Sequence, residues 1–219
     1  MCNNMNNRKD IYINDFRERY PKLEHLIPKI LDCVCMMKES VVNGGKLLFC
    51  GNGGSAADSE HIVGELMKGF KLKRSIGQAL IQRIQKEYPD QFEYYYDNLQ
   101  QGINAISLVS QNALTTAFSN DNAPNLIFAQ QVLGYGKEKD VLFAISTSGS
   151  SVNVIHAAKI AKVLGLDIIG LTGESGGDLK SYANILINVP EIETYKIQES
   201  HLPVYHLICL LLEVELYGE

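Results

Sequence analysis

The sequence predicts an α/β fold in which helices cover both faces of a parallel sheet. Short apolar segments at 47–51, 141–146, 167–173 and 184–190 have the length of buried strands, and helical patterns of apolar residues separate them. Turns rich in glycine or in serine and threonine follow the first three of these segments. Strands that alternate with helices in this way are typical of parallel sheets, and ligands bind such sheets at the carboxyl ends of the strands.

The other elements follow from apolar spacing and from the residues that end helices. Apolar residues at 15–43 recur at helical spacing up to Gly44. After the first strand, a glycine-rich turn leads into a helix that reaches Lys68. The remaining expected elements are an amphipathic helix that stops before Pro89, a helical face at Tyr94–Tyr96, a strand at 103–110, a helix or turn at 112–121, and helices at 125–136, 152–165 and 198–217. Because Pro203 is tolerated best in a first helical turn, we expect the last helix to start near Ser200 or to be kinked there.

Composition and charge exclude several classes of function. Of 219 residues, 46% are hydrophobic and 21% charged, and the net charge of −5 disfavours nucleic acid as a partner. No apolar run approaches the roughly 20 residues that span a bilayer, and the N-terminus lacks the apolar core of a secretory signal. Five cysteines, an odd number, favour reduced thiols in a cytoplasm. Cys33 and Cys35 could bind a soft metal, but no second cysteine pair accompanies them.

The turn in FAISTSGSSVNVI carries several hydroxyl side chains between a strand end and a helix start. Ser146, Thr147, Ser148 and Ser151 surround Gly149. A helix N-terminus presents free N–H groups and the positive end of its dipole, so neutral donors can bind a phosphate monoester here. An ordinary N-cap is the alternative, but it explains one hydroxyl rather than several. The spacing matches neither a Walker motif nor a Rossmann fingerprint.

A second glycine-rich turn, in LLFCGNGGSAADSEHIVGELMKGF, leads into a helix with two functional side chains. His61 and Glu65 are four residues apart, so both lie on one face of that helix. Such a pair can bind a metal or transfer a proton. An exposed surface pair is the alternative interpretation.

Four segments together resemble the sugar isomerase (SIS) domain family, and within it the phosphoheptose isomerase branch: GNGGSAADSEH, AISTSGSSVNVI, GLTGESGGDL and IQESHLPVYH. The resemblance covers the chain from about Gly44 onward. It implies one SIS domain over 1–219 with a three-layer, flavodoxin-like or Rossmann-like parallel sheet flanked by helices, and a helical N-terminal region at 1–43. It also implies a homotetramer whose sites are shared between subunits.

The resemblance implies aldose–ketose isomerisation of a phosphorylated sugar through an enediol. For this branch the reaction converts sedoheptulose 7-phosphate to D-glycero-D-manno-heptose 7-phosphate. Glu65 matches the general base and His206 the general acid, with His201 a nearby alternative. A carboxylate and an imidazole on opposite sides of a substrate can move a proton between two carbons at neutral pH.

The resemblance also implies which residues hold the substrate and a metal. The implied substrate-binding residues are Asn52, Gly53, Ser55, Asp121, Ser146, Thr147, Ser148, Ser151 and Gln198. The residues that match the ligands of one zinc ion per site are His61, Glu65, Gln198 and His206. Because a tightly bound metal would make Glu65 a poorer base, we rank its role as base above its role as ligand.

The sequence departs from the family pattern at two places. Tyr195 stands where phosphoheptose isomerases usually carry Asp, three residues before the metal-binding Gln. The segment 68–101 is longer than the usual link, and we expect an inserted helical segment that forms a flap over the site or extends a subunit interface. Its basic residues could hold an anionic substrate or lie on a solvated helix edge: Lys68, Lys71, Lys73 and Arg74.

Two other functions fit part of the pattern. A non-catalytic SIS regulator would bind a sugar phosphate and a protein partner, but that branch lacks the Glu and the final His that this chain keeps as Glu65 and His206. Another SIS isomerase, acting on an arabinose phosphate or an amino-sugar phosphate, is the second alternative.

Overall fold

The chain folds around one parallel sheet with the strand order β2-β1-β3-β4-β5. This flavodoxin-like order confirms the predicted α/β class. The computed structural model describes the backbone of residues 2–218 and the side chains of residues 8–218. The strands are β1 (Leu47–Cys50), β2 (Ala105–Ser107), β3 (Val141–Ser146), β4 (Asp167–Thr172) and β5 (Ile185–Asn188).

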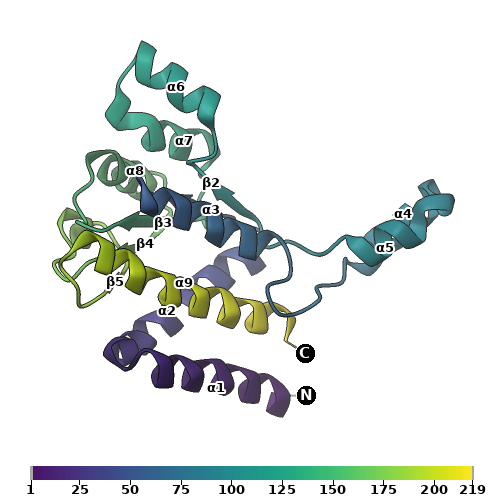
Figure 1. Cartoon of the computed structure of the whole chain (residues 1–219). Helices are drawn as coiled ribbons and strands as arrows, with labels where there is room; N and C mark the ends of the chain where they lie inside the picture. Colours follow the sequence, from purple (N-terminus) through teal and green to yellow (C-terminus); the bar gives the residue numbers. More distant parts are fainter. Residues whose placement is uncertain (1, 219) are drawn as a thin grey trace.

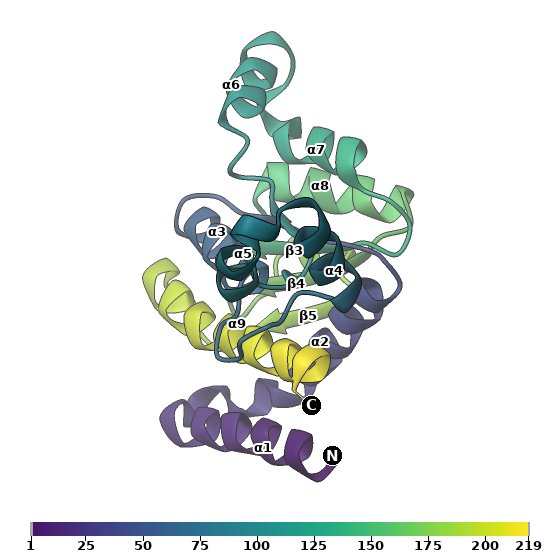
Figure 2. The same ribbon diagram turned by 90° about the vertical axis from the view of Figure 1, so that its right-hand side faces the viewer.

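Helices cover the sheet on both faces (Figures 1 and 2). On one face α2, α3 and α9 share a core with the strands, and α1 packs on the outside of α9. On the other face α7 and α8 pack against each other and against β3. The helices of these layers are α1 (Cys2–Arg19), α2 (Ile27–Val42), α3 (Gly54–Met67), α7 (Ile127–Tyr135), α8 (Val152–Val163) and α9 (Thr194–Tyr217).

The central strand β3 shows why these segments became strands. All six of its residues are buried, because helices cover both of its faces. Phe143 stacks on Phe49 of β1 on the side of α9, while Leu142 and Ala144 face α8. A continuous apolar run is therefore the pattern that this position requires.

Two boundaries differ from the sequence-based expectations. The strand expected at 103–110 spans only β2, because Ile103 donates its N–H to the Leu66 carbonyl at the end of α3 and the chain turns after Ser107. The helical region expected at 15–43 is broken by a 3-10 turn, η1 (Pro21–Leu26), since Pro21 cannot continue α1.

The last helix also differs, because it begins earlier than expected and contains its proline. α9 starts at Thr194, and Pro203 lies inside it. Proline removes one helical hydrogen bond and crowds the preceding turn. Pro203 and the following Val204 and Tyr205 are buried, and this burial offsets that cost.

Two helical segments extend from the body (Figure 1). The first, here called the arm (residues 78–98), consists of α4 (Gln78–Glu87), η2 (Pro89–Gln91) and α5 (Phe92–Asn98). All arm residues are described, and none of them is buried. The second holds α6 (Asn112–Asp121) and η3 (Pro124–Leu126), and the remaining short element is η4 (Asp178–Ser181). Among the described residues, no helix combines the length and the apolar character that a membrane span needs.

Candidate active site

Two turns meet at the point where the strand order reverses. β1 and β3 are neighbours, and the chain leaves their carboxyl ends toward α3 and α8 respectively. Asn52 in the first turn and Asn153 at the start of α8 exchange two amide hydrogen bonds of 2.8 and 2.9 Å. Ligands of doubly wound sheets bind at such a switch point. The structure therefore brings both sequence-predicted turns together.

The hydroxyl groups of the second turn gather around one point instead of capping α8. Ser146 Oγ lies 3.0 Å from Ser151 Oγ and 3.5 Å from Ser148 Oγ. Ser151 occupies the N-cap position of α8, but its side chain makes no capping hydrogen bond. Ser151 therefore does not act as an ordinary N-cap, and the cluster of hydroxyl donors at the start of α8 suits an anion.

Close backbone packing shapes the same turn. Gly149 has φ +68°, and a Cβ atom there would collide with the Gly176 carbonyl. Thr147 accepts a 3.0 Å hydrogen bond from the Gly173 N–H through its carbonyl oxygen. Thr147 and Ser148 line a cavity of about 220 Å³ together with residues of the two following loops, and its other lining residues are Gly173, Glu174, Ser175, Glu191, Ile192 and Ile197. A cavity of about 290 Å³ lies at Tyr20, and it shares Glu191 with the cavity at the serine turn.

The first turn contributes Ser55 and receives Gln198 from α9. Ser55 is buried in the first turn of α3, and Gly53 before it has φ +57°. The Gln198 amide packs so closely on Gly54 that any Cβ there would collide with Nε2. The Gln198 side chain, from α9, thus packs against the start of α3 beside the first turn.

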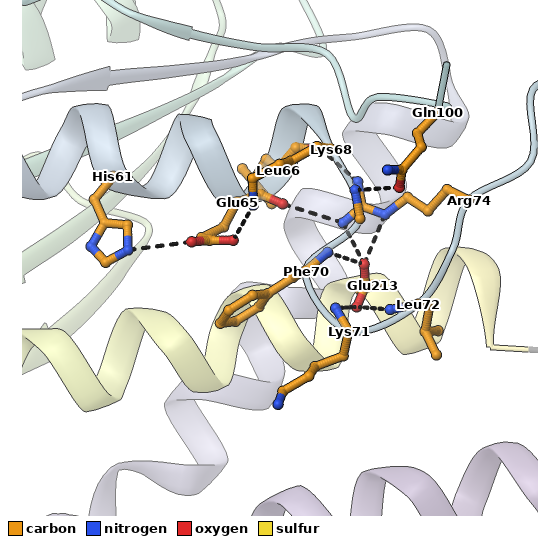
Figure 3. A network of polar contacts seen from close by, with 11 residues as sticks. His61, Glu65, Leu66, Lys68, Phe70, Lys71, Leu72, Arg74, Gln100 and Glu213 are labelled. Atoms are coloured by element: carbon orange, nitrogen blue, oxygen red, sulfur yellow. Dashed lines mark hydrogen bonds and ion pairs between the residues drawn. The ribbon is translucent and has the colours of Figure 1, made fainter. Parts of the chain in front are cut away.

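The packing of α3 against α9 brings the predicted acid–base residues together, and Figure 3 shows His61 and Glu65 on α3. His61 Nε2 lies 3.4 Å from Glu65 Oε1, and Lys68 Nζ lies 2.9 Å from Glu65 Oε2. The His61 and His206 rings meet edge to face, with centroids 5.1 Å apart. Sequence reasoning selected His61, Glu65 and His206 correctly as neighbours.

His206 is held as a neutral imidazole. Burial, and then the nearby His61, lower the pKa of His206 below its usual value. Its Nε2 atom is buried and has no hydrogen-bond partner among the described residues. His206 also lines a small cavity with Phe16 and Arg19 of α1. The N-terminal helix therefore forms part of the surroundings of this residue.

Sequence reasoning missed two residues that surround His61. Tyr205 Oη lies 3.0 Å from His61 Nδ1, and it donates a 3.3 Å hydrogen bond to Asp58 Oδ1. Burial raises the pKa of Asp58, and the bond from Tyr205 opposes this. Asp58 lies one helical turn before His61, and Tyr205 directly precedes His206, so helical spacing around the predicted pair was the available signal.

The side chains around His61 are of the types that bind metal ions. Two imidazoles and one carboxylate are the ligand types that zinc prefers, and the buried, unpartnered Nε2 of His206 suits a ligand. Within the described part of the chain, however, no three His, Cys, Asp or Glu side chains already stand at metal-binding positions. The residues are thus neighbours that would still have to turn toward an ion.

A buried ion pair fixes the end of α3 and the start of the link to the arm (Figure 3). Arg74 and Glu213 are each 1% exposed, and Arg74 Nε donates a 2.9 Å bond to Glu213 Oε1. Glu213 also accepts backbone N–H groups from residues 70–72, and Arg74 donates to the Leu66 carbonyl. The expectation that Arg74 could hold an anionic substrate is therefore wrong, because its guanidinium is buried and fully engaged.

Three further features of the sequence analysis lie apart from this cluster. Asp121 is the exposed last residue of α6, where it accepts a hydrogen bond from Asn120. α6 extends from the body, so the described chain does not bring Asp121 to its own phosphate-binding turns (Figure 1). Tyr195, which replaces the usual Asp, is exposed in the first turn of α9. The arm points away from the body and does not cover the turns of the same chain (Figures 1 and 2).

Comparisons of the sequence and of the structure with known proteins all identify the same family. SIS domain models match residues 11–105 and 108–211. A phosphoheptose isomerase of Clostridium acetobutylicum is 36% identical over 203 residues, which cover 93% of this chain and 90% of that protein. One from Akkermansia muciniphila is 37% identical over 175 residues, which cover 80% and 79%. The structure of a phosphoheptose isomerase from Neisseria gonorrhoeae aligns with a TM-score of 0.71 at 30% identity, over 91% and 93% of the two chains. With its two turns and its His61–Glu65–His206 cluster, the chain belongs to the phosphoheptose isomerase branch of the SIS domain family.

Proposed function

We propose that this protein is a phosphosugar isomerase that interconverts sedoheptulose 7-phosphate and D-glycero-D-manno-heptose 7-phosphate. The observation that carries the proposal is the meeting of Glu65 and His206, from distant segments, beside His61 on the paired helices α3 and α9. The hydroxyl-lined turn at residues 146–151 supplies the phosphate site that such a substrate needs.

The reaction moves a carbonyl group between the first two carbons of an open-chain sugar. Glu65, as carboxylate, removes the proton from the carbon next to the carbonyl and returns it to the other carbon. Neutral His206 still carries one ring N–H, which would protonate the carbonyl oxygen while the ring regains a proton from the adjacent hydroxyl, so that the imidazole ends the step unchanged. Ser55 and the serines of the second turn hold the phosphate and orient the chain of carbons.

We propose one zinc ion per site, held by His61, Glu65, Gln198 and His206. When bound, the metal polarises the substrate carbonyl and makes the adjacent C–H more acidic. The Gln198 amide packs on Gly54 at the start of α3, so its side chain would have to rotate to reach the ion. Glu65 would act as the base in preference to binding the ion, because a tightly bound metal would make its carboxylate a poorer base.

Family membership supports a further proposal on the assembly and the location. We propose a cytoplasmic homotetramer in which neighbouring subunits complete each site. Asp121 supports this assembly, because it lies on a projecting helix and would bind substrate hydroxyls only in a site shared between chains. The four cysteines with described side chains are free thiols, in keeping with this location: Cys33, Cys35, Cys50 and Cys209. The Cys2 side chain lies outside the described residues.

Deuterium exchange tests the activity directly. Incubated with sedoheptulose 7-phosphate in deuterated water, the protein should exchange the hydrogen on the carbon next to the carbonyl. Glu65→Gln should abolish this exchange, whereas Glu60→Gln on the exposed side of the same helix should retain it. Absence of exchange with heptose, pentose and hexose phosphates alike would refute an isomerase and favour the regulator.

Metal analysis tests the zinc proposal separately. The purified protein should contain about one zinc per chain, and His61→Ala should lower this content. His25→Ala, in η1, is the control because His25 is exposed and distant from the cluster. A protein that is fully active after removal of all zinc would exclude the metal without affecting the isomerase proposal.

A further inference from the structure

The phenol of Tyr205 lies between a carboxylate and an imidazole. Its oxygen is 3.0 Å from His61 Nδ1 and 3.3 Å from Asp58 Oδ1. Tyr205 is 2% exposed and its ring meets both His61 and His206 edge to face, so its position is fixed by packing. Neither the acid–base roles nor the metal ligands proposed above use Tyr205 or Asp58.

The number of protons decides the direction of both hydrogen bonds. A phenol has a single proton to donate, and an ionised carboxylate can only accept. Tyr205 therefore donates its one proton to Asp58 Oδ1, at 3.3 Å. The remaining bond is satisfied when His61 Nδ1–H donates to the Tyr205 oxygen.

We propose that Tyr205 and Asp58 are positioning residues that hold neutral His61 in its Nδ1–H tautomer. This leaves the lone pair on Nε2, the nitrogen that faces Glu65 at 3.4 Å (Figure 3). A cation bound between the Nε2 lone pair and the Glu65 carboxylate would stabilise this arrangement. Histidines that bind metals commonly donate their other ring N–H to a neighbouring residue, which fixes the tautomer. The inference depends on the proposed function only in placing His61 in the active site.

Nitrogen NMR of the metal-free protein reads the tautomer without any assay of activity. We expect the ¹⁵N shifts of His61 in its neutral form to show a protonated Nδ1 and an unprotonated Nε2. The loss of the signal in His61→Ala assigns it among the five histidines. A neutral His61 with its proton on Nε2 would overturn the positioning role, while the isomerase proposal, which deuterium exchange tests, would stand.

Two substitutions separate positioning from simple packing. In Asp58→Ala the phenol proton becomes free to bond Nδ1, so the tautomer should invert to Nε2–H. Asp58→Asn keeps an acceptor oxygen and should retain the original tautomer. If both variants fold and show the same tautomer, the hydrogen-bond chain does not control His61.

Zinc affinity gives a second readout. Tyr205→Phe removes only the hydroxyl, and it should weaken zinc binding about 10- to 100-fold in competition with a chromogenic chelator. Tyr135→Phe, a half-buried tyrosine on the opposite layer, is the matched control and should bind zinc as the wild type does. Unchanged affinity in Tyr205→Phe, together with an unchanged tautomer, would refute the positioning role.

Discussion

Ser151 begins a helix that its own side chain does not cap. Its hydroxyl faces Ser146 Oγ at 3.0 Å and not the first N–H groups of α8, of which the Val154 N–H is bonded to Asn153 Oδ1. A hydrogen bond to a charged group contributes about 1.5–3 kcal/mol. We therefore expect Ser146→Ala or Ser151→Ala to raise KM about 10- to 100-fold while the fold persists. Ser119→Ala in α6 is the control, and equal KM values for all three variants would remove this turn from the phosphate site.

His201 links stability to pH. It is fully buried, and burial lowers the pKa of its imidazole from 6.5 to about 4. Below about pH 6.5 the unfolded chain binds a proton that folded His201 does not, so stability should fall as the pH drops from 6.5 toward 4. The full effect is about 3 kcal/mol. Urea unfolding of wild type and His201→Leu near both ends of this pH range measures it, and the variant should lose much of the pH dependence.

At the scale of residues, the sequence predicts which side chains lie together where a motif is local. His61 and Glu65 share one helix face, and the serine turn lies in one short segment, so spacing alone identified them. Tyr205, Asp58 and the Arg74–Glu213 pair depend on the register between α3 and α9. That register is set by tertiary packing, which the sequence does not display.

At the scale of elements, Glu213 holds the chain that leaves α3. Its carboxylate accepts N–H groups from residues 70–72 and pairs with Arg74. Removing one partner of a buried pair costs about 3–5 kcal/mol, because the other charge stays buried. Glu213→Gln should therefore lower the free energy of unfolding by about that amount and speed hydrogen exchange at residues 68–77.

Glu215 provides the comparison for that experiment. It lies on the same helix and pairs with Lys38 at 2.7 Å, but it is 17% exposed. Ion pairs that solvent reaches contribute little, about 1 kcal/mol or less. Glu215→Gln should thus destabilise much less than Glu213→Gln. Equal losses in the two variants would show that burial does not set the strength of the Glu213 pair.

Strands and helices inside the body could be predicted well because burial requires a regular apolar pattern in the sequence. β3 was predicted with its observed bounds, since both of its faces are covered. β2 was predicted too long, because it is an edge strand whose flanking residues bond elsewhere. α9 was predicted too short, because Pro203 is a local signal that the buried helix overrides.

At the scale of the whole molecule, the arm stands apart from the packed layers. Its helices contact each other, and Tyr88 and Tyr95 meet edge to face. Arg83 and Lys86 are exposed on α4. Because accessible, weakly packed segments are cut first, we expect limited trypsin digestion to begin at these two residues. Protection of both sites in the native assembly would instead mean that a neighbouring subunit covers the arm.

Helices α3 and α9 pack together although they are far apart in the sequence. This affects the order in which the site forms during synthesis on the ribosome. Translation delivers the two phosphate-binding turns first and His206 last among the groups of the site. His61 therefore emerges well before Tyr205, the residue that contacts its Nδ1 atom at 3.0 Å. A premature stop before residue 194 therefore removes His206 together with the buried face of α9 that packs on α2 and α3.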